Sequence, residues 1–181
     1  MRPARAFHVR AGRGEDAPAI RALYQAVGAT PGGIARRPDE VTTDYVNDFV
    51  AHSLARGIII VAEFPDSTRL AAELHAYRSD LQVLKHVMGD LTIAVHPDAQ
   101  GQGLGRRMFV ELLDEVKSKH PDVTRVELIT QESNTRAQRL YESVGFRREG
   151  WLPGRIVGPS GQKEADIPMA WLRDSDRLRS E

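Results

Sequence analysis

The chain has 181 residues, of which 41% are hydrophobic and 28% charged, and its 25 basic and 25 acidic side chains give a formal net charge of +0. These values predict one globular domain over residues 1–181 and exclude a largely disordered chain. Balanced charge argues against nucleic-acid binding, and the lack of cysteine excludes disulfides, thiolate metal sites and a cysteine nucleophile. No apolar run approaches the length of a membrane-spanning helix, so we expect a cytoplasmic protein with no membrane partner. We also expect no bound metal.

The first third of the sequence predicts a short strand at residues 7–10 and two amphipathic helices. Asp16 is placed to cap the first helix, whose apolar residues recur at helical spacing: Ile20, Leu23, Tyr24 and Val27. The second helix has a similar stripe: Val46, Phe49, Val50 and Leu54. Residues 28–40 are rich in glycine and proline and are expected to form the connecting loop.

Three strands are expected next, with no helix between them. The apolar run 58–62 is typical of a buried strand. Alternation over residues 70–77 places Glu73, His75 and Tyr77 on a polar face, and alternation over 87–95 places Asp90 opposite Leu91. A doubly wound nucleotide-binding fold would need helices between these strands, so the order favours a mixed sheet.

The last part of the chain alternates helices and strands. A helix follows residue 103, with a buried stripe formed by Leu104, Met108, Phe109, Leu112, Leu113 and Val116. A strand at 123–130, a helix at 134–144 and closing strands at 146–151 and 165–172 follow, and residues 173–181 are expected to fray. The pattern predicts an α/β (α+β) fold with a mixed, mostly antiparallel sheet of about seven strands flanked by helices.

A glycine-rich turn between a strand and a helix is the most informative motif. It reads Gln100-Gly-Gln-Gly-Leu-Gly105. Glycines allow a ligand to approach the backbone, and the free N–H groups of a helix start attract phosphate. Arg106 and Arg107 can add charge-assisted contacts. The turn lacks the spacing of the dinucleotide fingerprint and of the P-loop. A flexible helix cap with no ligand is the alternative interpretation.

This turn resembles the pyrophosphate motif Q/R-x-x-G-x-G/A of the GCN5-related N-acetyltransferase (GNAT) superfamily. Residues 134–146, from Asn134 to Phe146, resemble that family's second motif, N-x-x-A-x-x-L-Y-x-x-x-G-F. The resemblance covers about residues 58–172. It implies the GNAT acyl-CoA N-acyltransferase fold, in which the parallel strands at 91–95 and 123–130 part in a V shape to admit acetyl-CoA.

The resemblance also implies which residues contact this co-substrate. The pantetheine arm would pair with the backbone near Ile93 and Val95, and the pyrophosphate would lie on the amides of the glycine turn. The implied binding residues are Ile93, Val95, Gln100, Gly101, Gln102, Gly103, Leu104, Gly105, Arg106, Asn134, Arg136 and Tyr141. Asn134 could instead cap its helix, and Arg136 could simply be solvated.

The implied reaction is acetyl transfer to a primary amine of a small molecule. With no cysteine to form a covalent intermediate, direct attack in a ternary complex is favoured. Tyr141 stands at the family's tyrosine position and is the candidate general acid for the departing sulfur. It also lies on the apolar stripe of its helix, so a role in the core is compatible with the same position.

The general base is left open by the sequence. Many members of the family carry a glutamate near position 89, which is glycine here, and Asp90 is the nearest acid. Glu73 and His75 are the other main candidates. His86, His96 and Glu127 acting through water are further options, as is deprotonation through water without a dedicated base. A non-catalytic acyl-CoA-binding or sensing module is the alternative function. Because relatives in this family often form dimers, a homodimer is a further expectation.

Overall fold

The structure is a computed structural model that describes residues 6–30, 33–65, 67–158 and 160–173. Its internal contacts divide the chain into two compact units. Unit 1 comprises Met1–Tyr77 and Thr92–Asp114, and unit 2 comprises Arg78–Leu91 and Glu115–Glu181. Each unit is described by itself, and the expectation of one domain over residues 1–181 stays a prediction.

Four α-helices and eight strands lie in the described residues. The helices are α1 (Ala17–Gly28), α2 (Thr43–Arg56), α3 (Leu104–Lys119) and α4 (Thr135–Ser143). The strands are β1 (His8–Ala11), β2 (Gly57–Glu63), β3 (Leu70–Tyr77), β4 (Val87–Val95), β5 (Arg125–Gln131), β6 (Arg147–Arg148), β7 (Leu152–Val157) and β8 (Lys163–Leu172).

The strand order is β1-β2-β3-β4-β5-β8-β6, and β7 pairs with β8. The neighbours β1–β2, β2–β3, β5–β8, β6–β8 and β7–β8 are antiparallel, whereas β4 and β5 are parallel. This confirms the expected mixed, mostly antiparallel sheet. The parallel register joins Val87 to Arg125 and Met88 to Val126. These are the parallel pairs found among the described residues, and the expected V-shaped parting of 91–95 from 123–130 stays a prediction.

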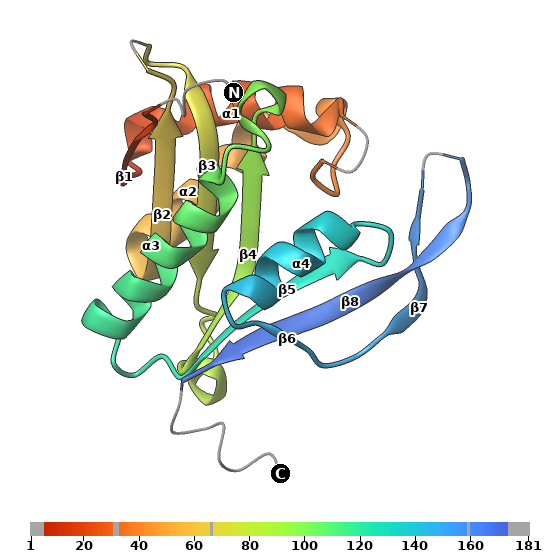
Figure 1. The fold of residues 1–181 in the computed structure, drawn as a ribbon. Helices are drawn as coiled ribbons and strands as arrows, with labels where there is room; N and C mark the ends of the chain where they lie inside the picture. Colours follow the sequence, from red (N-terminus) through yellow and green to blue (C-terminus); the bar gives the residue numbers. More distant parts are fainter. Residues whose placement is uncertain (1–5, 31–32, 66, 159, 174–181) are drawn as a thin grey trace. The chain divides into compact units, whose positions relative to one another are not determined.

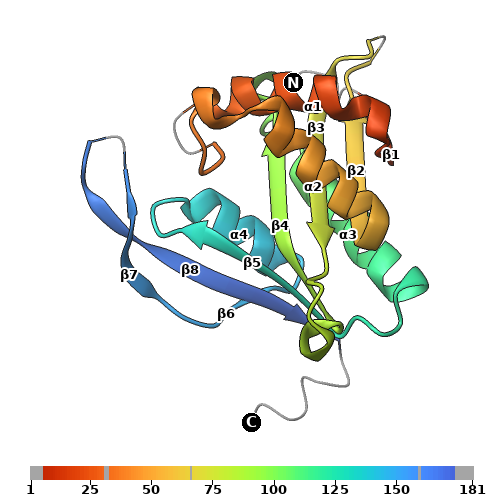
Figure 2. The same ribbon diagram turned by 180° about the vertical axis from the view of Figure 1, so that it is seen from behind.

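Helices cover both faces of the strands in unit 1. Figures 1 and 2 show α1 and α2 on one face of β2 and β3 and the first part of α3 on the other. Both faces of β2 are therefore buried, which explains the unbroken apolar run at 58–62. The predicted stripe of α3 is buried throughout, but the prediction for Leu54 was wrong, because its side chain is 50% exposed and Ser53 is buried instead.

Asp16 occupies the N-cap position of α1, as expected, but its carboxylate makes no capping hydrogen bond to this helix. It instead accepts two hydrogen bonds of 2.8 Å from the Arg10 guanidinium. A third comes from the backbone N–H of Arg13 at 2.8 Å. The hydrogen bonds from Arg10 are the largest cause that holds the pKa of Asp16 below its usual value, and the one from the Arg13 N–H acts in the same direction. The residue thus ties the end of β1 to the start of α1.

Replacing Asp16 with asparagine is expected to destabilise the protein by about 1–3 kcal/mol at pH 7, since hydrogen bonds to a buried ionised group are lost. Because folding lowers the pKa of Asp16, its stabilisation is complete above the unfolded pKa of about 3.9 and is lost as the pH falls through the folded value. Urea unfolding of both proteins at pH 7 and pH 3 measures this. A difference that stays constant across that range would contradict it.

Unit 2 is built around β8, which pairs with β5, β6 and β7. Its buried face carries Val126 and Leu128 of β5 opposite Trp171 and Met169 of β8. The helix α4 lies against the β5–β8 pair (Figures 1 and 2). The strand β7 was not predicted from the sequence, so the sheet has eight strands among the described residues where about seven were expected. Pro153 and Gly154 suggest a turn, but as an edge strand β7 does not need every backbone donor.

Arg173 was expected to fray, but hydrogen bonds hold it against the rest of unit 2. Its backbone N–H donates to the Thr124 carbonyl at 2.8 Å, and its guanidinium donates to the carbonyl of Val123 at 2.9 Å. The same guanidinium reaches the carbonyls of Val116 and His120, each at 3.0 Å. The rest of the expected tail, residues 174–181, lies outside the described residues.

Candidate active site

The glycine turn leaves an open stretch of backbone before α3. Gly101 and Gly103 have φ values of +74° and +76°, a left-handed conformation that favours glycine. A Cβ added at either position would meet no atom within 4 Å. The first turn of α3 closes when the N–H of Arg107 donates to the Gly103 carbonyl at 3.1 Å. The preceding N–H groups have no acceptor within the helix and carry its partial positive charge.

Two glutamine side chains brace this turn. Gln100 donates through Nε2 to the Val95 carbonyl at 3.2 Å, and Gln102 donates to the Asp98 carbonyl at 2.9 Å. Both bonds use the side chain to fix the backbone around Gly101 and Gly103. The structure therefore places Gln100 and Gln102 as supports of the glycine turn.

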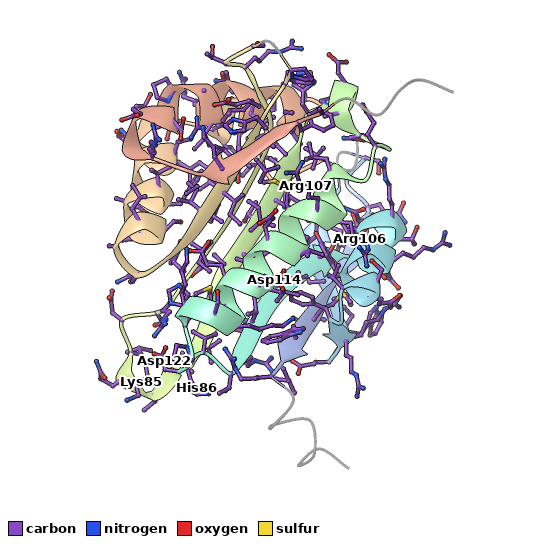
Figure 3. All side chains as sticks on the ribbon, turned by 60° about the vertical axis from the view of Figure 1, so that its left-hand side comes forward. Lys85, His86, Arg106, Arg107, Asp114 and Asp122 are labelled. Atoms are coloured by element: carbon purple, nitrogen blue, oxygen red, sulfur yellow. The ribbon has the colours of Figure 1, made fainter. Side chains whose placement is uncertain are left out.

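The two arginines after the turn have different surroundings. Figure 3 shows Arg106 and Arg107 on different sides of the start of α3. Arg107 donates to the Phe7 carbonyl at 3.1 Å and so ties α3 to the segment before β1. Arg106 is exposed and lies beside the glycines, where it can add charge for an anion. Leu104 is buried and Gly105 half-buried, so they serve the helix start itself.

Alternation along β4 breaks at Asp90, contrary to expectation. Asp90 has φ +47°, the one positive φ of a non-glycine residue among the described residues, and its side chain is exposed. After this point Ala94 is buried, while Ile93 and Val95 are half-buried. Asp90 is exposed and Leu91 is buried, as their predicted opposition requires, but the expected common face of Leu91, Ile93 and Val95 is wrong, because Ala94 takes the next buried position. The half-buried residues Ile93 and Val95 shortly precede the glycine turn.

Glu73 and His75 lie in the core of unit 1, so the predicted polar face of β3 is wrong. Their exposed fractions are 0% and 3%, because α1 and α2 cover this face. The Tyr24 hydroxyl donates to Glu73 Oε2 at 2.6 Å, and His75 Nδ1 lies 3.0 Å from Glu73 Oε1. The Phe49 ring stacks on His75 at 4.1 Å. Burial, followed by the charge of Glu73, raises the pKa of Tyr24 well above its usual value.

Replacing Tyr24 with phenylalanine is expected to lower the free energy of unfolding by about 1–3 kcal/mol, because a buried carboxylate loses its phenol donor. Denaturant unfolding at pH 7 measures the change. Tyr45→Phe is the control, since Tyr45 packs beside Tyr24 but does not bond to Glu73. An equal loss in both variants would contradict a specific role for the Tyr24–Glu73 bond.

The second motif lies on α4 in unit 2. Asn134 caps this helix, because its Oδ1 accepts from the Ala137 N–H at 3.2 Å. Arg136 is exposed. Tyr141 is 8% exposed, and burial raises its pKa to about 12. Its ring lies 6.2 Å from that of Phe146. The phenol is therefore protonated throughout the neutral range, as a general acid must be.

Sequence reasoning missed Gln138. It is 2% exposed, and its Nε2 donates to the carbonyls of Gln131 and Glu132, both at 2.9 Å. This amide ties α4 to the end of β5, where the strand's own hydrogen bonds stop. A polar residue next to the predicted apolar stripe carries no signal for this role in the sequence, because the acceptors come from another element.

The predicted site residues fall into three groups. Unit 1 holds the glycine turn with Ile93 and Val95, and separately the buried pair Glu73 and His75. Unit 2 holds Asp90, Asn134, Arg136 and Tyr141. Within the described residues there is no cluster of three metal-binding side chains and no helix long and apolar enough to cross a membrane.

Comparison with known proteins assigns the chain to a family. The profile of the acetyltransferase (GNAT) family matches residues 38–146. The chain therefore belongs to the GNAT family of acetyltransferases, as the two motifs predicted. The match spans α2 to Phe146 and includes both motifs.

Two curated relatives and one solved structure illustrate the similarity. The chain is 29% identical over 131 residues to the L-amino acid N-acyltransferase MnaT of Escherichia coli, covering 71% of this chain and 72% of that protein. It is 31% identical over 78 residues to the ribosomal protein bS18-alanine N-acetyltransferase of Haemophilus ducreyi, covering 43% of this chain and about half, 52%, of that protein. YncA from Salmonella typhimurium, described with its cofactor acetyl-CoA, superposes with a TM-score of 0.79 at 23% identity, covering 93% of this chain and 94% of that one.

Proposed function

We propose that the protein is an acetyl-CoA-dependent N-acetyltransferase that transfers an acetyl group to a primary amine of a small molecule. The glycine turn before α3 carries this proposal. It combines two left-handed glycines, open space above them and the unpaired N–H groups of a helix start. These are the features that a diphosphate needs in order to approach the backbone.

The co-substrate would follow the backbone from this turn. Its pyrophosphate would bind the amides from Gly101 to Arg106, and its pantetheine arm would pair with β4 near Ile93 and Val95, as an added strand does. The half-buried state of Ile93 and Val95 is compatible with such pairing. The acetyl-CoA described with YncA supports this choice of co-substrate. Asn134 and Arg136 remain proposed secondary contacts.

The chemistry is a direct attack of the amine on the thioester. The nitrogen lone pair forms the C–N bond, a tetrahedral oxyanion follows, and the C–S bond breaks. Tyr141 is the proposed acid that protonates the departing sulfur, since its phenol keeps its proton at neutral pH. The sequence has no cysteine to carry an acetyl-enzyme intermediate.

The relatives' names support an α-amino group as acceptor. One relative is named for L-amino acids and the other for an alanine of a ribosomal protein. The relative named for free amino acids matches the larger share of this chain, 71% against 43%. We therefore place small molecules bearing a primary α-amine first among the acceptors, ahead of protein N-termini.

Release of CoA from acetyl-CoA, measured with a panel of amines, tests this function. The panel contains L-amino acids, polyamines, simple alkylamines and a peptide with N-terminal alanine. We expect CoA release that depends on a small primary amine, with the acetylated product confirmed by mass spectrometry. Tight binding of acetyl-CoA without turnover on any amine would contradict the enzyme and favour the acyl-CoA-binding module.

A further inference from the structure

A histidine caps the short segment that joins β4 to the glycine turn. The strand ends at Val95, and Pro97–Ala99 form a short 3-10 helix with His96 as its N-cap residue. The Nδ1 atom of His96 accepts a hydrogen bond from the Asp98 N–H at 3.2 Å. Asparagine, aspartate, serine and threonine usually fill this position, because their side-chain oxygens accept from the backbone. His96 therefore does with a ring nitrogen what those residues do with an oxygen.

The residue that His96 caps also supports the glycine turn. The Asp98 carbonyl accepts a hydrogen bond from the side chain of Gln102 at 2.9 Å. Gln102 lies between Gly101 and Gly103, whose left-handed backbone leaves the open space described above. His96 thus holds the N–H of Asp98, and the carbonyl of Asp98 holds the turn. Through this one residue, a change at the cap reaches the backbone on which the diphosphate is proposed to lie.

The capping hydrogen bond fixes the protonation state of the ring. A ring nitrogen that accepts from an N–H carries no proton, so His96 is neutral and its proton is on Nε2. The sequence left His96 among the possible bases, but the lone pair of Nδ1 is already used. The side chain is 16% exposed, so a proton from solvent can reach the ring. Imidazole groups in general gain a second proton at about pH 6.5.

A charged ring would have a different partner in the same residue. Nδ1 lies 3.7 Å from Asp98 Oδ2, only slightly farther than from the Asp98 N–H. With a proton on Nδ1, the Asp98 N–H would face a second donor, while the carboxylate becomes the favourable acceptor. Arg69 is the second charged group at this position, with its Nη2 3.8 Å from the same Oδ2. The neighbours from the end of β2 and from β3, Phe64 and Ala71, are uncharged.

We propose that neutral His96 is a positioning residue for the glycine turn and that its protonation weakens the binding of acetyl-CoA. This inference rests on the proposed function. When Nδ1 gains a proton, the Asp98 N–H loses its acceptor, so the turn that Gln102 ties to this residue is held less firmly. Binding and protonation therefore oppose each other. The positive charge of the ring alone would attract an anion, so weaker binding in acid identifies the lost cap as the cause.

Calorimetric titration of acetyl-CoA into the wild-type protein, His96→Asn and His96→Ala, at pH 7.5 and pH 5.5, tests this proposal. Asparagine can accept from the same N–H through Oδ1 but does not titrate, whereas alanine cannot accept. One hydrogen bond is worth about fivefold in an equilibrium constant. At pH 7.5 we expect His96→Asn to bind within about twofold of the wild-type protein and His96→Ala about fivefold more weakly.

On going to pH 5.5, the wild-type protein should lose about fivefold more affinity than His96→Asn. The phosphates of acetyl-CoA titrate in the same range, but they do so alike with every variant, so the difference between proteins isolates His96. His52→Asn is the matched control, because it removes a titrating histidine from α2 of the same unit. It should keep the full pH dependence of the wild-type protein.

Three results would overturn the proposal. They are equal pH dependence in the wild-type protein and His96→Asn, wild-type affinity of His96→Ala at pH 7.5, and a loss of pH dependence in His52→Asn. If thermal unfolding shows that His96→Ala does not fold, the comparison of the wild-type protein with His96→Asn decides. A wild-type protein that binds no acetyl-CoA at pH 7.5 would refute the proposed function as well, whereas binding without these differences refutes this inference alone.

Discussion

A Gly103→Val variant is expected to bind acetyl-CoA about 100-fold more weakly than the wild-type protein while remaining folded. Gly103 has φ +76°, and a β-branched residue is strongly disfavoured in that conformation. The turn must therefore change its backbone to accept valine, and the amides that follow lose their common direction. A 100-fold loss corresponds to about 2.7 kcal/mol, comparable to losing one or two charge-assisted hydrogen bonds.

Gly161→Val provides the matched control for this variant. Gly161 has φ +79° and, like Gly103, no atom within 4 Å of an added Cβ. The local cost to the backbone is therefore similar, but Gly161 lies in the turn between β7 and β8 of unit 2. Calorimetric titration of acetyl-CoA into both variants, with thermal unfolding in parallel, measures the contrast. Equal loss of affinity in the two variants would show that the glycine turn has no special part in binding.

Replacing Tyr141 with phenylalanine is expected to lower kcat by about 30- to 100-fold at pH 7, near the lower end of the range for general acids. The modest size follows from the leaving group, since a thiol with a pKa of about 8.5 departs as a tolerable thiolate. The loss should be largest at low pH and should shrink above about pH 8.5, where a free thiolate no longer needs a proton. The KM for acetyl-CoA should stay within about threefold.

The pKa of Tyr141 gives this prediction a second readout. Burial raises that pKa to about 12, and the acid form is the one present below it. The wild-type rate should therefore show no decline due to Tyr141 until the pH approaches 12. Tyr45→Phe removes a phenol elsewhere and should leave the pH profile unchanged. A Tyr141→Phe variant with the wild-type rate at pH 6 would eliminate the general-acid role.

The periodicity of apolar residues correctly predicted the helices that have one apolar and one polar face. The stripe of α3 was correct because six apolar residues at helical spacing have only one way to be buried together. The run at 58–62 was correctly assigned to a buried strand for a similar reason. The glycine turn was located because several glycines between a strand and a helix indicate a backbone with positive φ values that a ligand can approach closely. In each case the signal lies within one segment.

The errors concern properties that depend on distant segments. Alternation in β3 correctly separated Glu73 and His75 from their neighbours but could not show that α1 and α2 cover that face. The left-handed conformation in β4 falls on Asp90 and not on its neighbour Gly89, where the sequence would suggest it. Gln138 gains its role from carbonyls on another element. Tertiary contacts of this kind leave no periodic trace in the sequence.

The hydrogen bonds of Arg173 bear on how the end of this chain tolerates alteration. Its guanidinium donates to the carbonyls of Val116 and His120 at the end of α3, and its positive charge lies where the helix carries a partial negative charge. Truncating the chain before Arg173 would leave these carbonyls without their donor. It would also remove the hydrogen bond from the Arg173 N–H to the Thr124 carbonyl, which holds the end of β8. Affinity tags and fusion partners are accordingly best appended beyond Arg173.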